Sequence, residues 1–251
     1  MKYAPSIGAS MLLLLNVAYS LSCKDFSSTG LPCVEAPECG SGSANIQVTK
    51  LSDGSKNSIS TSSIDLCYDS QYLRIANSAL SQKYFGNVSY SPCNDAIFNL
   101  DVSEAFIAPY ISGDAAPYCY SEIDLSPGNE IYESGISNPN LNHTGCSNSE
   151  YVCSAVDVQH KTVKHRTSWD ASLSIPWTLL NCPAGCPKST YCATDVAVVQ
   201  KVYRINFYRV NELTPVSKCS SSTCEYMAWS PTFANPPAFH EPKYFGYLVT
   251  V

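Results

Sequence analysis

Apolar and polar residues alternate along much of this chain, in short segments that are separated by turn residues. In residues 169–175 the apolar side chains fall on every second position, beginning with Trp169 and ending with Ile175, which is the period of a strand with one buried face. Comparable segments occur at 65–76, 102–108, 118–125, 196–208 and 247–251, with Gly-, Asn- and Pro-rich loops such as 134–149 between them. After residue 22 no long apolar pattern has the helical period. The pattern therefore predicts one all-β domain.

The alternation also predicts which side chains share a face. Trp169 is expected to point into the core together with the other apolar residues of its segment. Along 203–208 one face is apolar and the other joins hydrogen-bonding groups to an aromatic ring: Tyr203, Ile205 and Phe207 form the first, and Arg204, Asn206 and Tyr208 form the second. The polar face is either a solvated outer surface or a binding surface, and the alternation fits both interpretations.

The first 22 residues have the layout of a secretory signal peptide, with Lys2 near the start, an apolar run at 11–15 and small residues at 18–22. The apolar run is shorter than the roughly 20 residues that span a bilayer, so we expect no membrane insertion. Residues 23–45 are expected to form a lead-in rich in Cys, Ser and Gly, and residues 46–251 a single β-sandwich. We expect a secreted protein, located in the extracellular space or the cell wall.

The formal net charge is −6, which argues against nucleic acid as a partner. All thirteen cysteines follow the predicted signal peptide, and in an exported protein this density predicts a disulfide framework. A zinc site is less favoured, because none of the four histidines has a paired Cys/His spacing. The candidates for disulfides are Cys146, Cys153, Cys182, Cys186, Cys192, Cys219 and Cys224. The odd number leaves one thiol that is free or linked to a partner molecule.

Two acceptor sequons, at Asn87 and Asn142, predict a glycoprotein whose loops at these positions lie on the surface. Abundant aromatic residues, with 17 Tyr, 8 Phe and 3 Trp, are compatible with sugar recognition, because rings cover the apolar faces of a pyranose. Carboxylate, guanidinium and amide groups bind its hydroxyls. Tyrosine content by itself also fits a β-sandwich without any ligand.

Several short motifs follow one another in a fixed order. The last three are RINFYR at 204–209, AWSPT at 228–232 and FHEPKYFG at 239–246, and they are preceded by segments at 94–95, 101–107, 118–125 and 169–176. This order resembles the family 9 carbohydrate-binding modules over residues 46–251. The resemblance implies a DOMON-like antiparallel β-sandwich of jelly-roll type, here stapled by disulfides.

The resemblance also implies a non-catalytic site that holds the end of a sugar chain between two rings. Carried over by position, the rings are Phe98 and Trp229 and the hydroxyl-binding glutamate is Glu104; Phe98 stands where the family has a tryptophan. Arg204 and Asn206, on the polar face of their strand, complete the expected carbohydrate site. The expected ligand is a plant or microbial cell-wall polysaccharide or oligosaccharide. Structural calcium is common in the family, and Asp95 and Asp101 have suitable chemistry for it.

Other functions remain open at this stage. Glu104 could have a structural role in place of sugar binding, as the ion-pair partner of Arg204 or Arg209. A glycoside hydrolase needs two carboxylates that flank the scissile bond, and the sequence leaves such a pair open among Asp95, Asp101, Glu104 and Glu122. A single sandwich of this size seldom forms the deep cleft that hydrolysis requires, and the chain has no G-x-S-x-G or H-E-x-x-H motif, so an enzyme is not expected. A role beside a glycoside hydrolase in carbohydrate catabolism is one alternative.

A b-type haem domain for electron transfer is another alternative, with Met227 and either His160 or His165 as axial ligands. A third is a wall or matrix protein that has lost its ligand.

Overall fold

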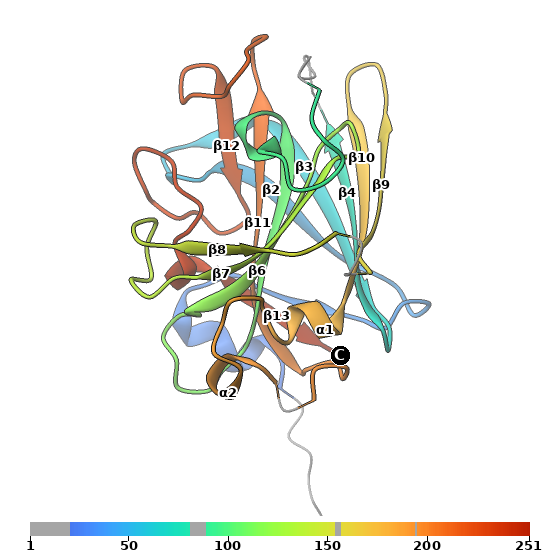
Figure 1. Cartoon of the computed structure of the whole chain (residues 1–251), viewed down its shortest axis with the longest axis vertical. Coiled ribbons are helices and arrows are strands. Elements are labelled where there is room, and N and C mark those ends of the chain that lie inside the picture. The colour runs from blue at the N-terminus through green and yellow to red at the C-terminus, as the bar shows by residue number, and fades with distance from the viewer. Residues whose placement is uncertain (1–20, 81–88, 154–156, 194) are drawn as a thin grey trace, which may run out of the picture.

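The computed structural model describes residues 21–80, 89–153, 157–193 and 195–251. Within these ranges thirteen strands form one strongly curled sheet (Figure 1). The strands are β1 (Cys33–Ala36), β2 (Ala44–Leu51), β3 (Asn57–Tyr68), β4 (Tyr72–Leu80), β5 (Val102–Pro109), β6 (Cys119–Leu125), β7 (Ile131–Ser137), β8 (Ser147–Glu150), β9 (Gln159–Lys164), β10 (Trp169–Pro176), β11 (Val202–Glu212), β12 (Cys224–Ala228) and β13 (Gly246–Thr250).

Helical structure in the described residues is limited to single turns and one short 3-10 segment. These are η1 (Cys23–Thr29), η2 (Ile97–Asn99), α1 (Trp177–Leu180), α2 (Lys188–Tyr191) and η3 (Pro242–Tyr244). No helix in these ranges combines the length and the apolar character of a membrane span. The predicted signal peptide falls outside the described residues, apart from Leu21 and Ser22.

The strand order is β8-β7-β6-β5-β11-β12-β2-β3-β4-β10-β9, with β13 beside β11 and β1 beside β13. All these pairs are antiparallel except β1 with β13. The curl brings the two halves of the sheet face to face, and in Figure 1 strands β6 to β8 cross in front of β2 to β4. Ile75 of β4, Ile107 of β5 and Phe207 of β11 accordingly share one apolar core. The predicted all-β sandwich is confirmed.

The predicted faces are confirmed as well. Trp169 is fully buried in the main core, where its indole Nε1 donates to Asp101 over 3.1 Å. Along β11, Tyr203, Ile205 and Phe207 belong to the same core, whereas Tyr208 belongs to a second apolar cluster on the opposite face. Both faces of β11 are buried, so its polar face is not a solvated outer surface.

Two strand boundaries differ from the prediction. The segment 65–76 spans the end of β3, a turn and the start of β4. The turn is made by Asp69, whose carboxylate accepts from the backbone N–H groups of Gln71 and Tyr72, and no Gly or Pro marks it in the sequence. In the segment 196–208 the strand begins only at Val202.

The lead-in contributes to the sheet, because β1 pairs with β13. The structure contains six disulfides: Cys23–Cys33, Cys39–Cys67, Cys93–Cys153, Cys119–Cys186, Cys182–Cys192 and Cys219–Cys224. The predicted framework is therefore present, and six of the seven candidate cysteines take part in it. The exception is Cys146, which is the unpaired thiol and corrects its assignment as a disulfide candidate. Its Sγ donates to the carbonyl oxygen of Asn142 in its own loop, and nothing observed here supports a covalent partner.

Candidate functional site

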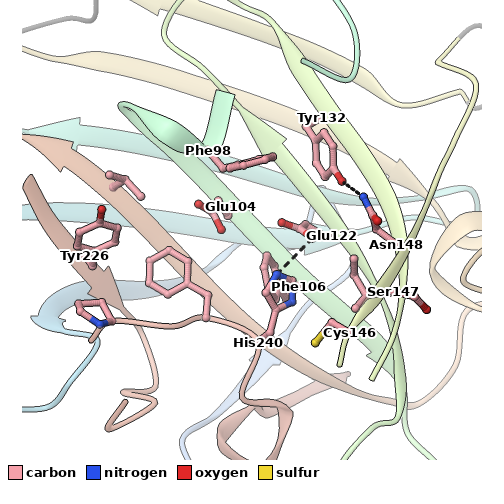
Figure 2. Close-up of a pocket in the computed structure, with 14 residues that line it drawn as sticks. Phe98, Glu104, Phe106, Glu122, Tyr132, Cys146, Ser147, Asn148, Tyr226 and His240 are labelled. Atoms are coloured by element: carbon pink, nitrogen blue, oxygen red, sulfur yellow. Dashed lines mark hydrogen bonds and ion pairs between the residues drawn. The ribbon is translucent and has the colours of Figure 1, made fainter. Parts of the chain in front are cut away.

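A pocket of about 360 Å³ lies on the face of β5, β6 and β11 that points away from the main core. Its floor comes from these strands, and its walls come from η2, β7, the loop that leads into β8, β12 and the loop before η3 (Figure 2). The lining residues are Phe98, Glu104, Phe106, Glu122, Tyr132, Ile136, Cys146, Ser147, Asn148, Val210, Tyr226, Pro237, Phe239 and His240.

Strand alternation explains the acidic floor. On β5, Ala105 and Ile107 face the main core, so Glu104 and Phe106 face the pocket. On β6, Ile123 and Leu125 face the core in the same way, which leaves Glu122 and Asp124 on the pocket side. The register places Glu104 directly opposite Asp124, and Phe106 opposite Glu122. Two adjacent strands thus bring three carboxylates together.

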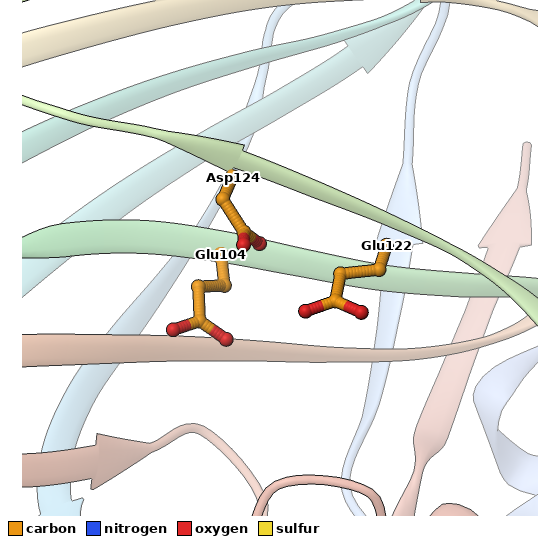
Figure 3. Close-up of side chains that lie close together, drawn as sticks. All are labelled: Glu104, Glu122 and Asp124. Atoms are coloured by element: carbon orange, nitrogen blue, oxygen red, sulfur yellow. The ribbon is translucent and has the colours of Figure 1, made fainter. Parts of the chain in front are cut away.

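The carboxylates of Glu104, Glu122 and Asp124 each offer an oxygen that lies within 4.8 Å of the others (Figure 3). All three residues are buried, with exposed fractions of 4%, 6% and 0%. Burial raises the pKa of Glu104, Glu122 and Asp124, and the neighbouring carboxylates raise the pKa of Glu104 and Asp124 further. Such a cluster can accept hydrogen bonds from several hydroxyls, hold a cation, or share protons.

The arginines of β11 do not neutralise this cluster. Arg204 donates to the carbonyl oxygen of Phe245 over 2.6 Å and to that of Ala115 over 3.3 Å. Arg209 lies on the core face and pairs with Asp101 at 3.5 Å. Both arginines thus have partners other than Glu104, which argues against a structural ion pair between Glu104 and either of them.

His240 lies closer to the cluster, with its Nε2 atom 3.9 Å from a carboxylate oxygen of Glu122. Burial lowers the pKa of His240 to about 4, so its ring is neutral near pH 7. Its Nδ1 atom is 2.8 Å from the hydroxyl of Tyr120, and Asn138 donates to the backbone carbonyl of His240 over 3.2 Å. These bonds fix the ring at the pocket wall as a neutral donor or acceptor.

Aromatic rings stand above the polar floor. Phe98 is 41% exposed and meets Tyr132 edge to face at 5.4 Å. Across the pocket Phe239 stacks on Tyr208, with ring centroids 4.2 Å apart and planes at 10°, and its edge faces Tyr226. The pocket therefore joins flat apolar surfaces to hydrogen-bonding groups, which is the combination that pyranose binding requires.

The structure brings together two of the five expected carbohydrate-binding residues, Phe98 and Glu104. Trp229 lies elsewhere, in a separate hollow of about 490 Å³ with Phe233 and Tyr244. Arg204 borders a third, much smaller hollow. Asn206 is fully buried and bonded on both sides of its amide, because Nδ2 donates to the carbonyl of Ser230 and Oδ1 accepts from the N–H of Ser230.

Sequence reasoning missed most of the pocket. Glu122 and Asp124 alternate with Ile123 and Leu125, and this regular acidic face was a readable signal. Phe239 and His240 belong to the loop before η3, which has no regular alternation of apolar and polar residues. Only the fold brings that loop over β5 and β6.

The expected calcium ligands have other partners. Asp101 accepts from Trp169 and pairs with Arg209, and Asp95 accepts from the backbone N–H groups of Ser91 and Ala96. Asp95 and Asp101 thus take part in hydrogen bonds and an ion pair within the fold, and neither belongs to the buried cluster of Glu104, Glu122 and Asp124.

The haem alternative finds no support in the geometry. Met227 is fully buried in the main core. His165 pairs with Asp170 at 2.8 Å, and His160 lies 3.2 Å from the amide oxygen of Asn129. Met227 and the two histidines thus lie in different parts of the fold, each with its own partners, and do not form a pair of axial ligands.

No protein-family model matches the chain. Over 195 residues it is 28% identical to a protein of Arthroderma benhamiae that is named an extracellular protein, and the match covers 75% of this chain and 78% of that one. Among solved structures it is similar to a proposed carbohydrate-binding protein from Bacteroides uniformis, with a TM-score of 0.57 and 14% identity over 88% of this chain and 97% of that chain. A family 9 carbohydrate-binding module from Caldicellulosiruptor kristjanssonii, solved with cellotriose, gives a TM-score of 0.48 and 9% identity over 87% and 93%. At such identity the likeness to the Bacteroides protein establishes a shared fold.

Proposed function

We propose that this chain is a secreted carbohydrate-binding protein without catalytic activity. Its ligand is a cell-wall polysaccharide chain end or an oligosaccharide, held in the pocket above Glu104 and Glu122. The observation that carries the proposal is that aromatic side chains, of which Phe98 is exposed, meet buried carboxylates in one pocket of about 360 Å³, within the usual size range of small-ligand sites. A pocket of this size accommodates one or two sugar rings, which favours a chain end over the middle of a polymer.

The chemistry divides between the two levels of the pocket. The exposed ring of Phe98 offers a face to the C–H surface of a pyranose, and Phe239, one face of which is covered by Tyr208, adds apolar surface to the same pocket. The carboxylates of Glu104 and Glu122 accept hydrogen bonds from adjacent hydroxyls, and such bonds are the stronger kind when the acceptor is charged. Asn148 borders the same pocket and has a second amide proton beyond the one that it donates to Tyr132.

Secretion is supported by the six disulfides, which persist in oxidising compartments. The extracellular relative is compatible with it. Asn142 lies in the loop between β7 and β8 and is partly exposed, so we also propose that it carries a glycan. The other sequon, Asn87, lies outside the described residues.

The arrangement of the carboxylates supports binding without hydrolysis. Hydrolysis requires an acid and a nucleophile or base that flank the scissile bond. Here Glu104 and Glu122 stand next to each other on the same floor, on paired strands, and a third carboxylate lies beside them.

The test compares two exposed phenylalanines in different hollows. Phe98→Ala should weaken binding of the preferred oligosaccharide by about 1–2 kcal/mol, roughly five- to thirtyfold in Kd, because a stacking face is lost. Phe233→Ala is the matched control, since Phe233 is 60% exposed and lies with Trp229 in the other hollow. Binding is screened on cellulose, xylan, β-glucan and chitin and then measured by titration with the matching oligosaccharides.

Trp229→Ala decides between the two hollows. If it abolishes binding while Phe98→Ala leaves the Kd unchanged, the sugar binds in the hollow around Trp229 and the assignment of the pocket is wrong. Failure of the protein to bind any of the four polysaccharides would favour a structural wall protein. Release of sugar from any of them would show an enzyme.

A further inference from the structure

The carboxylates of Glu104, Glu122 and Asp124 form a cluster for which the proposed sugar site gives no complete account. Asp124 does not line the pocket; it lies opposite Glu104 on the neighbouring strand, with no exposed surface. The three side chains offer oxygens within 4.8 Å of one another. Figure 3 shows the three side chains close together, with the carboxylate of Asp124 directed toward Glu104.

Asp124 supplies a second, independent observation. Both of its carboxylate oxygens are buried, and neither has a hydrogen-bond partner among the described residues. A buried carboxylate with no partner destabilises the fold, because it has lost its hydrogen bonds to water and has no protein hydrogen bond in their place. The side chain is directed toward Glu104, its cross-strand neighbour, so the missing partner belongs in the space between the carboxylates.

Among the described residues, no cationic side chain forms an ion pair with Glu104 or Asp124. Arg204 and Arg209 have the partners described above, and the Nε2 atom of His240 lies 3.9 Å from Glu122 while its Nδ1 atom is bonded to Tyr120.

We propose that Glu104, Glu122 and Asp124 bind a calcium ion at the floor of the pocket, and that two hydroxyls of the bound sugar complete its coordination. A cluster of carboxylate oxygens suits a hard cation and not a thiol- or imidazole-seeking one. Calcium accepts 6–8 oxygen ligands in flexible geometry, whereas magnesium holds its waters in a strict octahedron. Calcium is thus the cation that can exchange water for sugar hydroxyls.

The position of the three residues determines where those hydroxyls enter. Asp124 is fully buried, whereas Glu104 and Glu122 line the pocket, so the open coordination positions lie on the pocket side, where the sugar binds. The coordination of the ion by sugar hydroxyls, which is the second half of the inference, rests on the proposed function. The first half, the calcium site, does not.

The calcium site is tested by titration calorimetry on protein treated with EDTA and then freed of chelator. The wild-type protein should bind one calcium ion per chain, and its melting temperature should rise with calcium concentration. Asp124→Asn, which keeps the side-chain shape, should weaken calcium binding at least about tenfold. The same variant should melt at or above the wild-type temperature in EDTA, because an unpartnered buried charge is gone, a gain that a purely structural aspartate would not give.

Asp95→Asn is the control, since Asp95 has backbone partners and lies outside the cluster; it should bind calcium as the wild type does. Glu122→Gln is a second variant of the cluster that should also weaken calcium binding. The inference is overturned if the wild type shows neither binding heat nor a melting shift at millimolar calcium, or if Asp124→Asn binds calcium as tightly as the wild type.

Sugar titrations with and without EDTA separate the two halves. Loss of sugar binding in EDTA, restored by calcium, is the expected result. Sugar binding that is equal in EDTA and in calcium overturns the bridging role while the proposed function stands. Calcium binding without binding of any sugar overturns the proposed function and the bridging role, and leaves the ion site in place.

Discussion

Replacement of Trp169 tests the interior of the sandwich most directly. The indole is fully buried in the main core, its Nε1 donates to Asp101 over 3.1 Å, and the guanidinium of Arg209 lies 5.5 Å from its ring centre. The side chain therefore contributes apolar burial and also satisfies one member of a buried ion pair. These two contributions can be measured separately.

Trp169→Ala empties the whole site, and substitutions of this type cost about 3–5 kcal/mol. Trp169→Phe keeps most of the apolar surface and removes the donor to Asp101, which should cost about 1–3 kcal/mol for a buried acceptor left short of a partner. For a chain of this size 1 kcal/mol corresponds to about 2–4 °C in melting temperature. The alanine variant should therefore melt roughly 6–20 °C below the wild type.

The assay is thermal and denaturant unfolding with the disulfides intact, and Trp229→Ala is the reference because Trp229 is only partly buried. The reasoning is refuted if Trp169→Ala melts within about 2 °C of the wild type, below the shift expected for 1 kcal/mol. It is equally refuted if Trp229→Ala is the more destabilising of the two.

Two further predictions concern single groups. Glu212 is buried with neither carboxylate oxygen bonded, and burial raises its pKa to about 7; because the folded-state pKa lies above the unfolded one, stability should fall as pH rises from about 4.5 to 7. Glu212→Gln should remove that loss and gain up to about 3 kcal/mol relative to the wild type above pH 7, and identical pH profiles of unfolding for both proteins would contradict this. Thiol titration of the denatured, unreduced protein should find one thiol, absent from Cys146→Ser, and three or more thiols would contradict the disulfide framework.

The sequence predicted the sandwich because its period-2 alternation is a local signal. Trp169 and Phe207 lie on the predicted side of their strands, since a side chain's face follows from its position in the strand alone. The turn at Asp69 escaped prediction, because a side-chain carboxylate that accepts backbone N–H groups leaves no Gly or Pro to mark the break.

The sequence predicted only those pocket residues that strand alternation or the resemblance to the family 9 modules could identify. Glu104 was found on β5, and Phe98 was found by its position before that strand. Trp229 follows β12 directly, and the distance along the chain gave no sign that it lies away from Glu104. The register that pairs Glu104 with Asp124 depends on how β5 and β6 align, which is a property of the pair and not of either strand.

The disulfides explain how the fold tolerates an acidic pocket floor. Each buried carboxylate whose pKa is raised costs about 1.4 kcal/mol per pKa unit when it is ionised. Two disulfides act close to this floor: Cys119–Cys186 ties β6, three residues before Glu122, and Cys93–Cys153 ties the segment that leads to Phe98. They close loops with sequence separations of 67 and 60 residues, each of which removes about 4 kcal/mol of chain entropy from the unfolded state in the loop-closure model. This stabilisation opposes the cost of ionising the buried carboxylates of the floor, and the same cross-links hold the walls of the pocket in place.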